Sequence, residues 1–157
     1  MLKEYEDLPS KFKHALMEKV ETVQPYWTML GIKLVDIKKG WAKLKLPYSE
    51  KIVQPYGAVH GGAIFSLADS AFAMALIGLT ERDERFTTIE MKINYVSSFN
   101  KGEITAEAKV IDRVRQTVVG DVTILDEDGR LVAKSMGTYI ILKNNAIEVK
   151  KDDGRFN

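Results

Sequence analysis

Apolar side chains recur every three to four residues near the start of the chain, which is the spacing of one face of an α-helix. The pattern runs from Ser10, a residue type suited to capping, to Val23, and Pro25 breaks it. A short bulky apolar segment, residues 26–30, follows and ends at Gly31. We therefore predict an N-terminal helix ahead of the remaining elements.

Alternation of apolar and polar residues with a period of two indicates strands in much of the remaining chain. It marks residues 41–47, and residues 32–37 are expected to form the strand that leads into them. Four more strands are predicted, at residues 86–97, 104–110, 116–125 and 131–142. Short turns between them favour an antiparallel meander, so the pattern predicts an α+β fold rather than alternating βαβ units.

Strict alternation also assigns the two faces of the strand predicted at residues 86–97. The apolar face is formed by Ile89, Met91, Ile93 and Tyr95, and the polar face by Thr88, Glu90, Lys92 and Asn94. We therefore expect Thr88 to point away from the apolar face of this strand.

The segment before these four strands, residues 61–79, is apolar almost all the way round. Between residues 63 and 77, its polar side chains are two serines and Asp69. A surface helix keeps a polar face, so a helix of this composition must be buried on most sides. A sheet that curls around the helix is the most economical way to bury it.

Asp69 places a charge near the middle of this apolar helix. An unpaired carboxylate in a dry environment is costly in free energy, or it takes up a proton. A helix that served only the core would have an apolar residue at this position. Asp69 is therefore a candidate catalytic group. The alternative is a carboxylate that faces water where the helix emerges, or that pairs with a nearby Arg or Lys.

His60, Gly61 and Gly62 lie at the junction between a loop and this helix. Two glycines let a ligand approach the backbone closely. The first turn of a helix offers unpaired N–H groups and the positive end of the dipole, from which the backbone alone can build an oxyanion hole or an anion site. The alternatives are a glycine pair that eases a tight turn and a histidine with a structural role in the loop.

Composition excludes several classes of site and partner. The 157 residues include no cysteine and two histidines, which excludes disulfides, iron–sulfur clusters and thiol nucleophiles and supplies few zinc ligands. The formal net charge of +1 argues against nucleic-acid binding. The acidic N-terminus lacks the apolar region of a signal peptide, and no stretch has the length and apolarity of a membrane span. We therefore expect a cytoplasmic protein with no membrane or nucleic-acid partner.

The motif QPYGAVHGGAIFSLADSAFAMA, residues 54–75, resembles the signature of hotdog-fold thioesterases of the PaaI (phenylacetate-degradation) type. The order of elements from Pro25 to Leu142 is also similar to that of a hotdog domain, in which an antiparallel sheet wraps around a long helix. The resemblance implies three parts: a helical extension at residues 1–24, a hotdog thioesterase domain at 25–143 and a polar tail at 144–157.

The resemblance also implies roles for the motif residues. Asp69 matches the catalytic carboxylate, which acts as a general base or as a nucleophile. Gly61 matches the residue whose N–H polarises the thioester carbonyl, and Gly62 adjoins it at the substrate. His60 matches a histidine that positions the substrate or supports the oxyanion. No metal or organic cofactor is implied, and coenzyme A enters as part of the substrate.

Two further residues are assigned by the same resemblance. Gln54 occupies the place where many relatives carry Asn, so it is expected to hold the attacking water or the substrate carbonyl, with a reach altered by one methylene group. Thr88 matches a Ser or Thr that holds water in some relatives. The adjacent Thr87 is an equal candidate, because the sequence does not fix the register.

The substrate implied is an aromatic, phenylacetyl-like or medium-chain acyl-CoA. Its acyl group is expected in an apolar pocket, for which the candidates are Tyr56, Phe65, Phe72 and Met74, although residues of these types more often belong to a core. The CoA phosphates need cationic partners, for which the candidates are Lys92, Arg113 and Arg115, although the pair Arg113 and Arg115 is more typical of a solvated strand end.

The resemblance implies a homodimer with the active site at its interface, in which Asp69 of one chain acts with His60 and Gly61 of the other. Two dimers are expected to form a tetramer. Symmetric pairing would bury an apolar face that one small sheet leaves uncovered.

Three other functions stay open. They are a hydratase or dehydratase of acyl thioesters, a non-catalytic binder of acyl-CoA or aromatic ligands, and a structural dimerisation domain. Asp69 distinguishes them from a thioesterase, because a binder gains nothing from a carboxylate near the thioester carbonyl, and elimination needs a differently placed acid.

Overall fold

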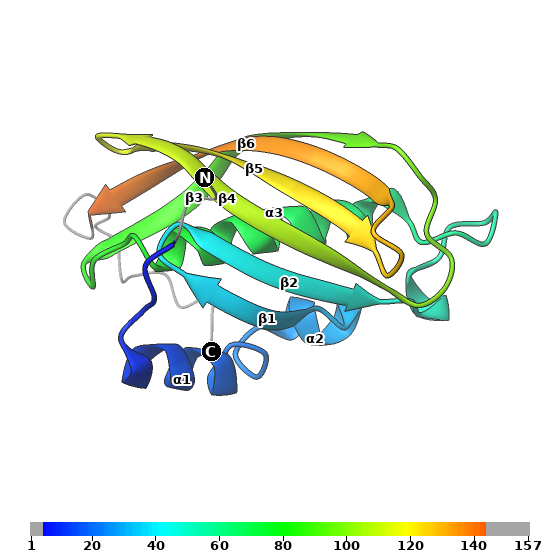
Figure 1. Cartoon of the computed structure of the whole chain (residues 1–157), viewed down its shortest axis with the longest axis horizontal. Helices are drawn as coiled ribbons and strands as arrows, with labels where there is room; N and C mark the ends of the chain where they lie inside the picture. Colours follow the sequence, from blue (N-terminus) through cyan, green and yellow to red (C-terminus); the bar gives the residue numbers. More distant parts are fainter. Residues whose placement is uncertain (1–4, 144–157) are drawn as a thin grey trace, which may run out of the picture.

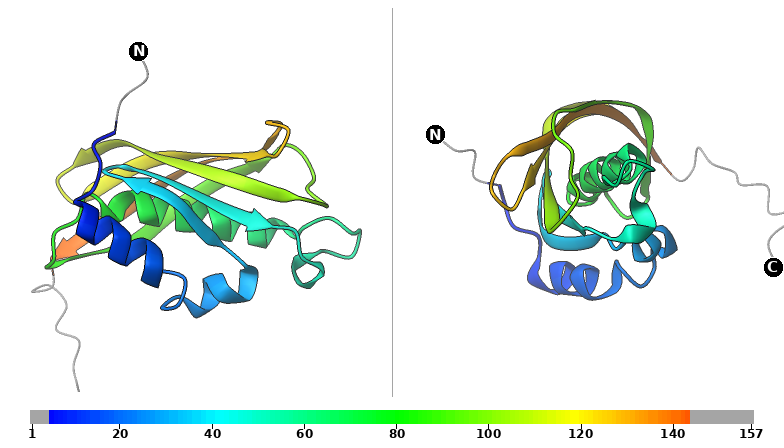
Figure 2. Two further views of the ribbon diagram at one scale, coloured as in Figure 1. Left: turned by 60° about the horizontal axis from the view of Figure 1, so that its bottom comes forward. Right: turned by 90° about the vertical axis from the view of Figure 1, so that its right-hand side faces the viewer.

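The computed structural model describes residues 5–143 as one curved antiparallel sheet wrapped around a long helix (Figure 1). The helices are α1 (Ser10–Lys19), α2 (Pro25–Leu30), α3 (Gly61–Ile77) and a 3-10 turn, η1 (Glu50–Ile52). The strands are β1 (Lys33–Lys38), β2 (Trp41–Pro47), β3 (Glu84–Tyr95), β4 (Glu103–Val114), β5 (Thr117–Asp126) and β6 (Leu131–Lys143). Seen end on, the sheet curls around α3, while α1 and α2 lie outside it (Figure 2). The predicted α+β class and the helix-wrapping sheet are confirmed.

The strand order is β1-β2-β4-β5-β6-β3. β4, β5 and β6 form a meander, but β3 pairs with β6 at the edge of the sheet, so the expected meander of four strands was wrong. Residues 100–102 do not close a hairpin, because the segment after β3 passes the end of the sheet before β4 begins (Figure 1). The Val96 N–H bonds to the Val132 carbonyl, the Val59 N–H bonds to the Phe99 carbonyl, and Phe99 is buried. These contacts hold the connection from β3 to β4 across the end of the sheet. β3 is therefore an edge strand beside β6 and not a neighbour of β4.

Helix α3 is buried on most sides, as its apolar pattern predicts. Its buried residues are Ala63, Ile64, Leu67, Ala68, Ala71, Phe72, Met74, Ala75 and Leu76. The sheet leaves one side of the helix partly uncovered, and we call this side the open strip of α3: Phe65, Ser66, Asp69, Ser70, Ala73 and Ile77. Within residues 5–143, no helix has the length and apolarity needed to cross a bilayer.

Two glycines make a seat for Phe72 in the inner face of the sheet. Gly120 on β5 and Gly137 on β6 are direct cross-strand partners. A Cβ atom at Gly120 would lie 2.4 Å from the Phe72 ring, and one at Gly137 would lie 3.3 Å from it. Phe72 is fully buried in this seat and packs edge-on against Tyr139. Phe72 is therefore a core residue, and the expectation that it lines an acyl pocket was wrong.

Gly120→Ala is expected to lower the free energy of unfolding by about 3 kcal/mol, because the added methyl group overlaps the Phe72 ring. It would also lie 2.7 Å from the Lys109 carbonyl oxygen. Urea unfolding measures the loss. Gly129→Ala is the control, since its Cβ meets nothing within 4 Å and only its positive φ is unfavourable, at about 1 kcal/mol. Equal losses in the two variants would show that Phe72 has room to move.

A bulge in β3 changes which of its residues face the helix. The pairing of β3 with β6 shifts register between Thr88 and Glu90, where one strand carries an extra residue. Phe86 and Thr88 face α3 before the bulge and Met91 packs inward after it, while Ile89 is exposed. The expected assignment of faces was therefore wrong for Thr88 and Ile89, because the bulge resets the alternation. It was right for Met91 and Ile93, which lie beyond the bulge.

The N-terminal helix is shorter than predicted. α1 ends at Lys19, and its N-cap is Pro9 with no side-chain cap, so Ser10 starts the helix without capping it. Val20 is buried under the helix, whereas Val23 is 70% exposed and lies beyond it. The predicted apolar stripe thus packs inward only in its middle, at Leu16 and Val20, while Phe12 and Val23 at its two ends are exposed.

Candidate active site

Asp69 lies on the open strip of α3 and lines a groove of about 510 Å³ beside the helix. Residues of α2, α3 and β3 and the residue before α2 form this groove: Gln24, Tyr26, Trp27, Phe65, Ser66, Asp69, Ser70, Ala73, Met74, Ile77 and Phe86. Asp69 is half-buried, and it makes no ion pair with any residue that the structure describes. The carboxylate is held by hydroxyl groups instead.

One oxygen of Asp69 accepts two hydrogen bonds from the sheet. The Tyr139 hydroxyl donates to Oδ1 at 2.6 Å, and the Thr88 hydroxyl donates to the same atom at 2.9 Å. Donors of this kind stabilise the negative charge of the carboxylate. No group within residues 5–143 donates to Oδ2. This second oxygen is therefore available to a ligand in the groove.

The bulge in β3 explains how Thr88 reaches Asp69. Adjacent residues of a strand point to opposite faces, so Thr87 and Thr88 cannot both face the helix. The hydrogen bond to Asp69 identifies Thr88 as the inward residue. Thr88 thus contacts the carboxylate of its own chain, and its expected role in holding water stays a prediction.

Tyr139 is a residue of the site that the sequence analysis missed. Its position in the alternation of β6 is typical of a core residue, and it is 2% exposed. Its ring packs against Phe72 at a centroid distance of 4.8 Å and against Phe86 at 5.9 Å. Burial and the Asp69 carboxylate raise the pKa of the Tyr139 hydroxyl far above its usual value, so this group remains a donor. The sequence does carry a signal for this residue, because it places a tyrosine on the apolar face of a strand. A buried tyrosine hydroxyl needs a polar partner, which here is Asp69.

His60 caps the N-terminus of α3. Its Nδ1 accepts the Gly62 N–H at 2.8 Å, and its backbone is extended, with φ −61° and ψ 133°. The Gly61 N–H has no hydrogen-bond partner in the part of the chain that the structure describes. The Gly61 amide is therefore available to a substrate oxygen, whereas the Gly62 amide is already used. His60 has a structural part in this arrangement, whatever else it contributes.

A second hollow, of about 310 Å³, lies at this end of the helix, and Gln54, Gly61 and Tyr95 are among the residues that line it. The Tyr95 hydroxyl donates to the Gly61 carbonyl at 3.0 Å, and a Cβ atom at Gly61 would lie 3.2 Å from the Tyr95 ring. Gln54 Oε1 accepts the Tyr56 N–H, which leaves the NH₂ group of Gln54 free to donate. Gln54 and Gly61 therefore line the same hollow, and their expected roles at the substrate stay predictions.

The two halves of the expected site are separate within one chain. Gly61 and Asp69 are eight positions apart on α3, which corresponds to about 12 Å along the helix axis. They also line different hollows. Reacting groups must lie within about 3.5 Å of each other, so one chain cannot bring both residues to the same thioester.

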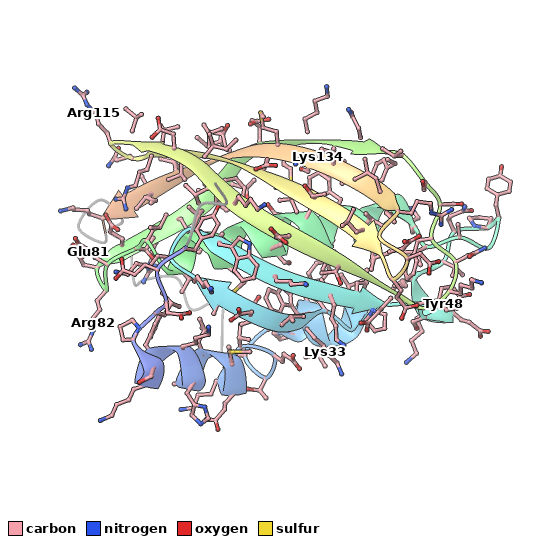
Figure 3. All side chains as sticks on the ribbon, viewed as in Figure 1. Lys33, Tyr48, Glu81, Arg82, Arg115 and Lys134 are labelled. Carbon is pink, nitrogen blue, oxygen red and sulfur yellow. The ribbon has the colours of Figure 1, made fainter. Side chains whose placement is uncertain are left out.

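Several expected substrate contacts lie away from the groove. Tyr56 is 95% exposed in the loop before α3. Arg115 projects from the turn between β4 and β5, at the opposite end of the sheet from Tyr48 (Figure 3). Phe65 and Met74 line the groove, and their place in an acyl pocket stays a prediction. Of these candidates, the groove of one chain is therefore lined by the two α3 residues and not by Tyr56.

Arg113, expected to bind a CoA phosphate, is tied into the fold. Its guanidinium donates to the Leu79 carbonyl at 2.8 Å and to the Glu84 carboxylate at 2.9 Å. The Glu81 N–H and Arg113 hold the pKa of Glu84 below its usual value. The stability that this carboxylate contributes is therefore present at neutral pH and is lost as the pH falls through the lowered pKa.

Arg113→Ala is accordingly expected to lower the free energy of unfolding by about 1–2 kcal/mol at neutral pH and to leave KM for acyl-CoA unchanged. Urea unfolding and steady-state kinetics measure the two quantities. The difference in stability from the wild type should shrink in acid, where Glu84 is protonated. If the variant raised KM and left the free energy of unfolding unchanged, Arg113 would instead be assigned to the CoA phosphates.

Comparisons with known proteins identify the family of this chain. The family model described as the thioesterase superfamily matches residues 56–133. The 1,4-dihydroxy-2-naphthoyl-CoA hydrolase of Listeria monocytogenes is 33% identical, over 73% of this chain and 93% of its own length.

Two solved structures share the fold along most of their length. A mutant of the phenylacetic acid degradation protein PaaI from Thermus thermophilus is 27% identical with a TM-score of 0.69, over 74% of this chain and 98% of its own. A Streptococcus mutans protein bound to acetyl-CoA is 26% identical with a TM-score of 0.66, over 71% of this chain and 89% of its own. The chain therefore belongs to the thioesterase superfamily, and it is a hotdog-fold thioester hydrolase.

Proposed function

We propose that this protein hydrolyses acyl-CoA thioesters, with Asp69 as the catalytic carboxylate and the Gly61 amide as the oxyanion donor. The observation that carries the proposal is the state of Asp69 on an otherwise apolar helix. The carboxylate is anchored through Oδ1 and keeps Oδ2 free in a groove. A binding protein has no use for an acid held in this way.

The proposed active site forms between two copies of the chain. The open strip of α3 is partly uncovered, and β3 has no neighbour on its outer side within residues 5–143. With a two-fold axis beside these elements, the open strip of one α3 packs against the open strip of the other, and the two β3 strands lie side by side. The uncovered helix face and the unpaired strand edge are then both buried. The two α3 helices then run antiparallel, so Asp69 of one chain meets His60 and Gly61 of its partner. Assembly of two such dimers into a tetramer belongs to the same proposal.

The chain's own groups account for the reaction. Asp69 Oδ2 takes a proton from water while the water oxygen bonds to the thioester carbon, or Oδ2 itself attacks that carbon and water later releases the acid. The Gly61 N–H and the positive end of α3 stabilise the negative charge that forms on the carbonyl oxygen. The C–S bond then breaks, the thiolate of CoA takes up a proton, and the free acid leaves. The proposed reaction uses no metal or organic cofactor.

The groove beside Asp69 is suited to an apolar acyl group. Its apolar wall consists of Trp27, Phe65, Ala73, Met74, Ile77 and Phe86. A volume of about 510 Å³ lies within the range of roughly 300–1,000 Å³ that is usual for small-molecule sites. Aromatic and medium-chain acyl groups are therefore the proposed substrates. The relatives named for a naphthoyl-CoA and for phenylacetic acid degradation favour the aromatic class.

The test is a panel of acyl-CoA thioesters that includes phenylacetyl-CoA, benzoyl-CoA, hexanoyl-CoA and acetyl-CoA. Release of free thiol by the purified wild-type protein is followed for each. We expect turnover, with kcat/KM higher for the aromatic or medium-chain members than for acetyl-CoA. Binding without turnover of any member would favour the acyl-CoA-binding alternative. Hydration of an enoyl-CoA without thiol release would favour the hydratase.

A further inference from the structure

The hydrogen bonds of Asp69 distinguish its two oxygens. Oδ1 accepts the hydroxyls of Tyr139 and Thr88, at 2.6 and 2.9 Å, whereas no described residue donates to Oδ2. The terminal torsion of an Asp side chain is soft, so either oxygen can turn toward a substrate unless something fixes one of them. Two donors on a single oxygen remove that freedom.

Tyr139 is the more rigid of the two donors. It lies on β6, which is paired on both sides, and its buried ring is packed between Phe72 and Phe86. Thr88 is exposed and belongs to the edge strand, beside the bulge. The Tyr139 hydroxyl also lies 3.0 Å from the main-chain carbonyl oxygen of Asp69, so its one hydrogen has both a side-chain and a main-chain acceptor of the same residue within reach. The core therefore fixes this donor independently of any substrate.

We infer that Tyr139 is a positioning residue, which holds Oδ1 of Asp69 and thereby makes Oδ2 the oxygen that meets the water or the thioester. Tyr139 is not among the residues that line the groove, so it acts through Asp69. The inference rests on the proposed function of Asp69 and adds to it both a residue and the identity of the reacting oxygen. Neither follows from the motif around α3, because Tyr139 lies 70 positions further along the chain.

Tyr139→Phe tests this inference, because it removes the hydroxyl and keeps the ring that packs against Phe72. We expect kcat for the best acyl-CoA to fall about 10- to 100-fold, since displacing a reacting group by about 1 Å has effects of this size. KM is expected to stay within about twofold, because the groove is unchanged. Urea unfolding establishes that the variant is folded under the assay conditions.

Ser135→Ala is the matched control. Ser135 also lies on β6, is 3% exposed and donates its hydroxyl across to β3, at 2.9 Å to the Lys92 carbonyl. The variant loses a buried hydroxyl and one hydrogen bond, as Tyr139→Phe does, but none that involves Asp69. We expect a comparable loss of stability and a wild-type kcat. A fall in kcat as large as that of Tyr139→Phe would overturn the positioning role.

A double-mutant cycle separates positioning from a general structural role. If Tyr139 acts through Asp69, then Tyr139→Phe has no further effect on the residual rate of Asp69→Asn. The same fold loss in both backgrounds, or an unchanged kcat in the single variant, would overturn the inference and leave the proposed function intact. Full activity of Asp69→Asn would overturn the proposed function instead.

Discussion

Asp69→Asn is expected to lower kcat for the best acyl-CoA substrate by about 10²-fold or more. Asparagine keeps the size of the side chain and an Oδ1 atom that can accept the hydroxyls of Tyr139 and Thr88. It replaces Oδ2 by an NH₂ group, which can neither take a proton from water nor attack the thioester. The rate of thiol release at saturating substrate measures the loss.

Asp83→Asn is the control for this change. Asp83 is an exposed acid between α3 and β3 and does not line the groove, so its amide variant should keep the wild-type kcat. KM should stay close to the wild-type value for both variants, because neither substitution changes the apolar wall. If Asp69→Asn hydrolysed thioesters at the wild-type rate, the catalytic role would belong to another group.

Gly61→Pro is expected to lower kcat by about 10²- to 10³-fold, the range seen when one oxyanion donor is removed. Gly61 is the first residue of α3, a position where proline is favoured because the N–H there is not needed by the helix. The extended backbone of His60 also suits a residue that precedes proline. The substitution therefore removes the amide hydrogen and preserves the helix, which circular dichroism checks.

Gly61→Ala separates the amide from the added bulk. Both variants place a Cβ atom 3.2 Å from the Tyr95 ring, but only alanine keeps the N–H. We expect Gly61→Ala to retain most of the wild-type kcat. Equal losses in the two variants would assign the effect to the contact with Tyr95 and would remove the amide from the mechanism.

Mixed dimers of the two inactive variants test whether two chains share each site. When Asp69→Asn and Gly61→Pro chains are refolded together, half of the dimers are mixed, and each mixed dimer has one site with both residues intact. Activity should therefore recover to about one quarter of the wild-type value, provided that the symmetric interface brings the two residues together. If each chain contained a complete site, mixing would restore nothing.

The helix and the place of its one carboxylate could be predicted because their signals are local. Asp69 stands out against an apolar helix, and His60 to Gly62 mark the place where that helix begins. The same segment predicts burial on most sides, which the wrapped sheet provides. Each of these conclusions uses only neighbouring residues and the period of the helix.

The parts that could not be predicted depend on pairings between distant segments. The period-two alternation of inward and outward side chains along β3 breaks at Ile89, because the bulge adds a residue there. Ile89 is exposed, and nothing in its apolar side chain predicts this. The partners of Tyr139 and Arg113 come from other elements, so sequence alone assigns the first to the core and the second to solvent or a phosphate. The position of β3 next to β6 likewise depends on the connection between β3 and β4, which joins strands that are not neighbours and has no turn motif to predict it.

The seat that Gly120 and Gly137 form for Phe72 stops α3 from sliding or rotating on the sheet. Phe72 is three residues from Asp69, so an apolar contact on the buried side of the helix sets the distance between the carboxylate and its hydroxyl donors. The side chains that shape the acyl groove on the open strip, such as Phe65 and Ile77, form no part of this seat. Phe86, by contrast, both lines the groove and packs against Tyr139. Substitutions at Phe65 or Ile77 are therefore expected to change the proposed acyl groove without moving Asp69 away from its hydroxyl donors.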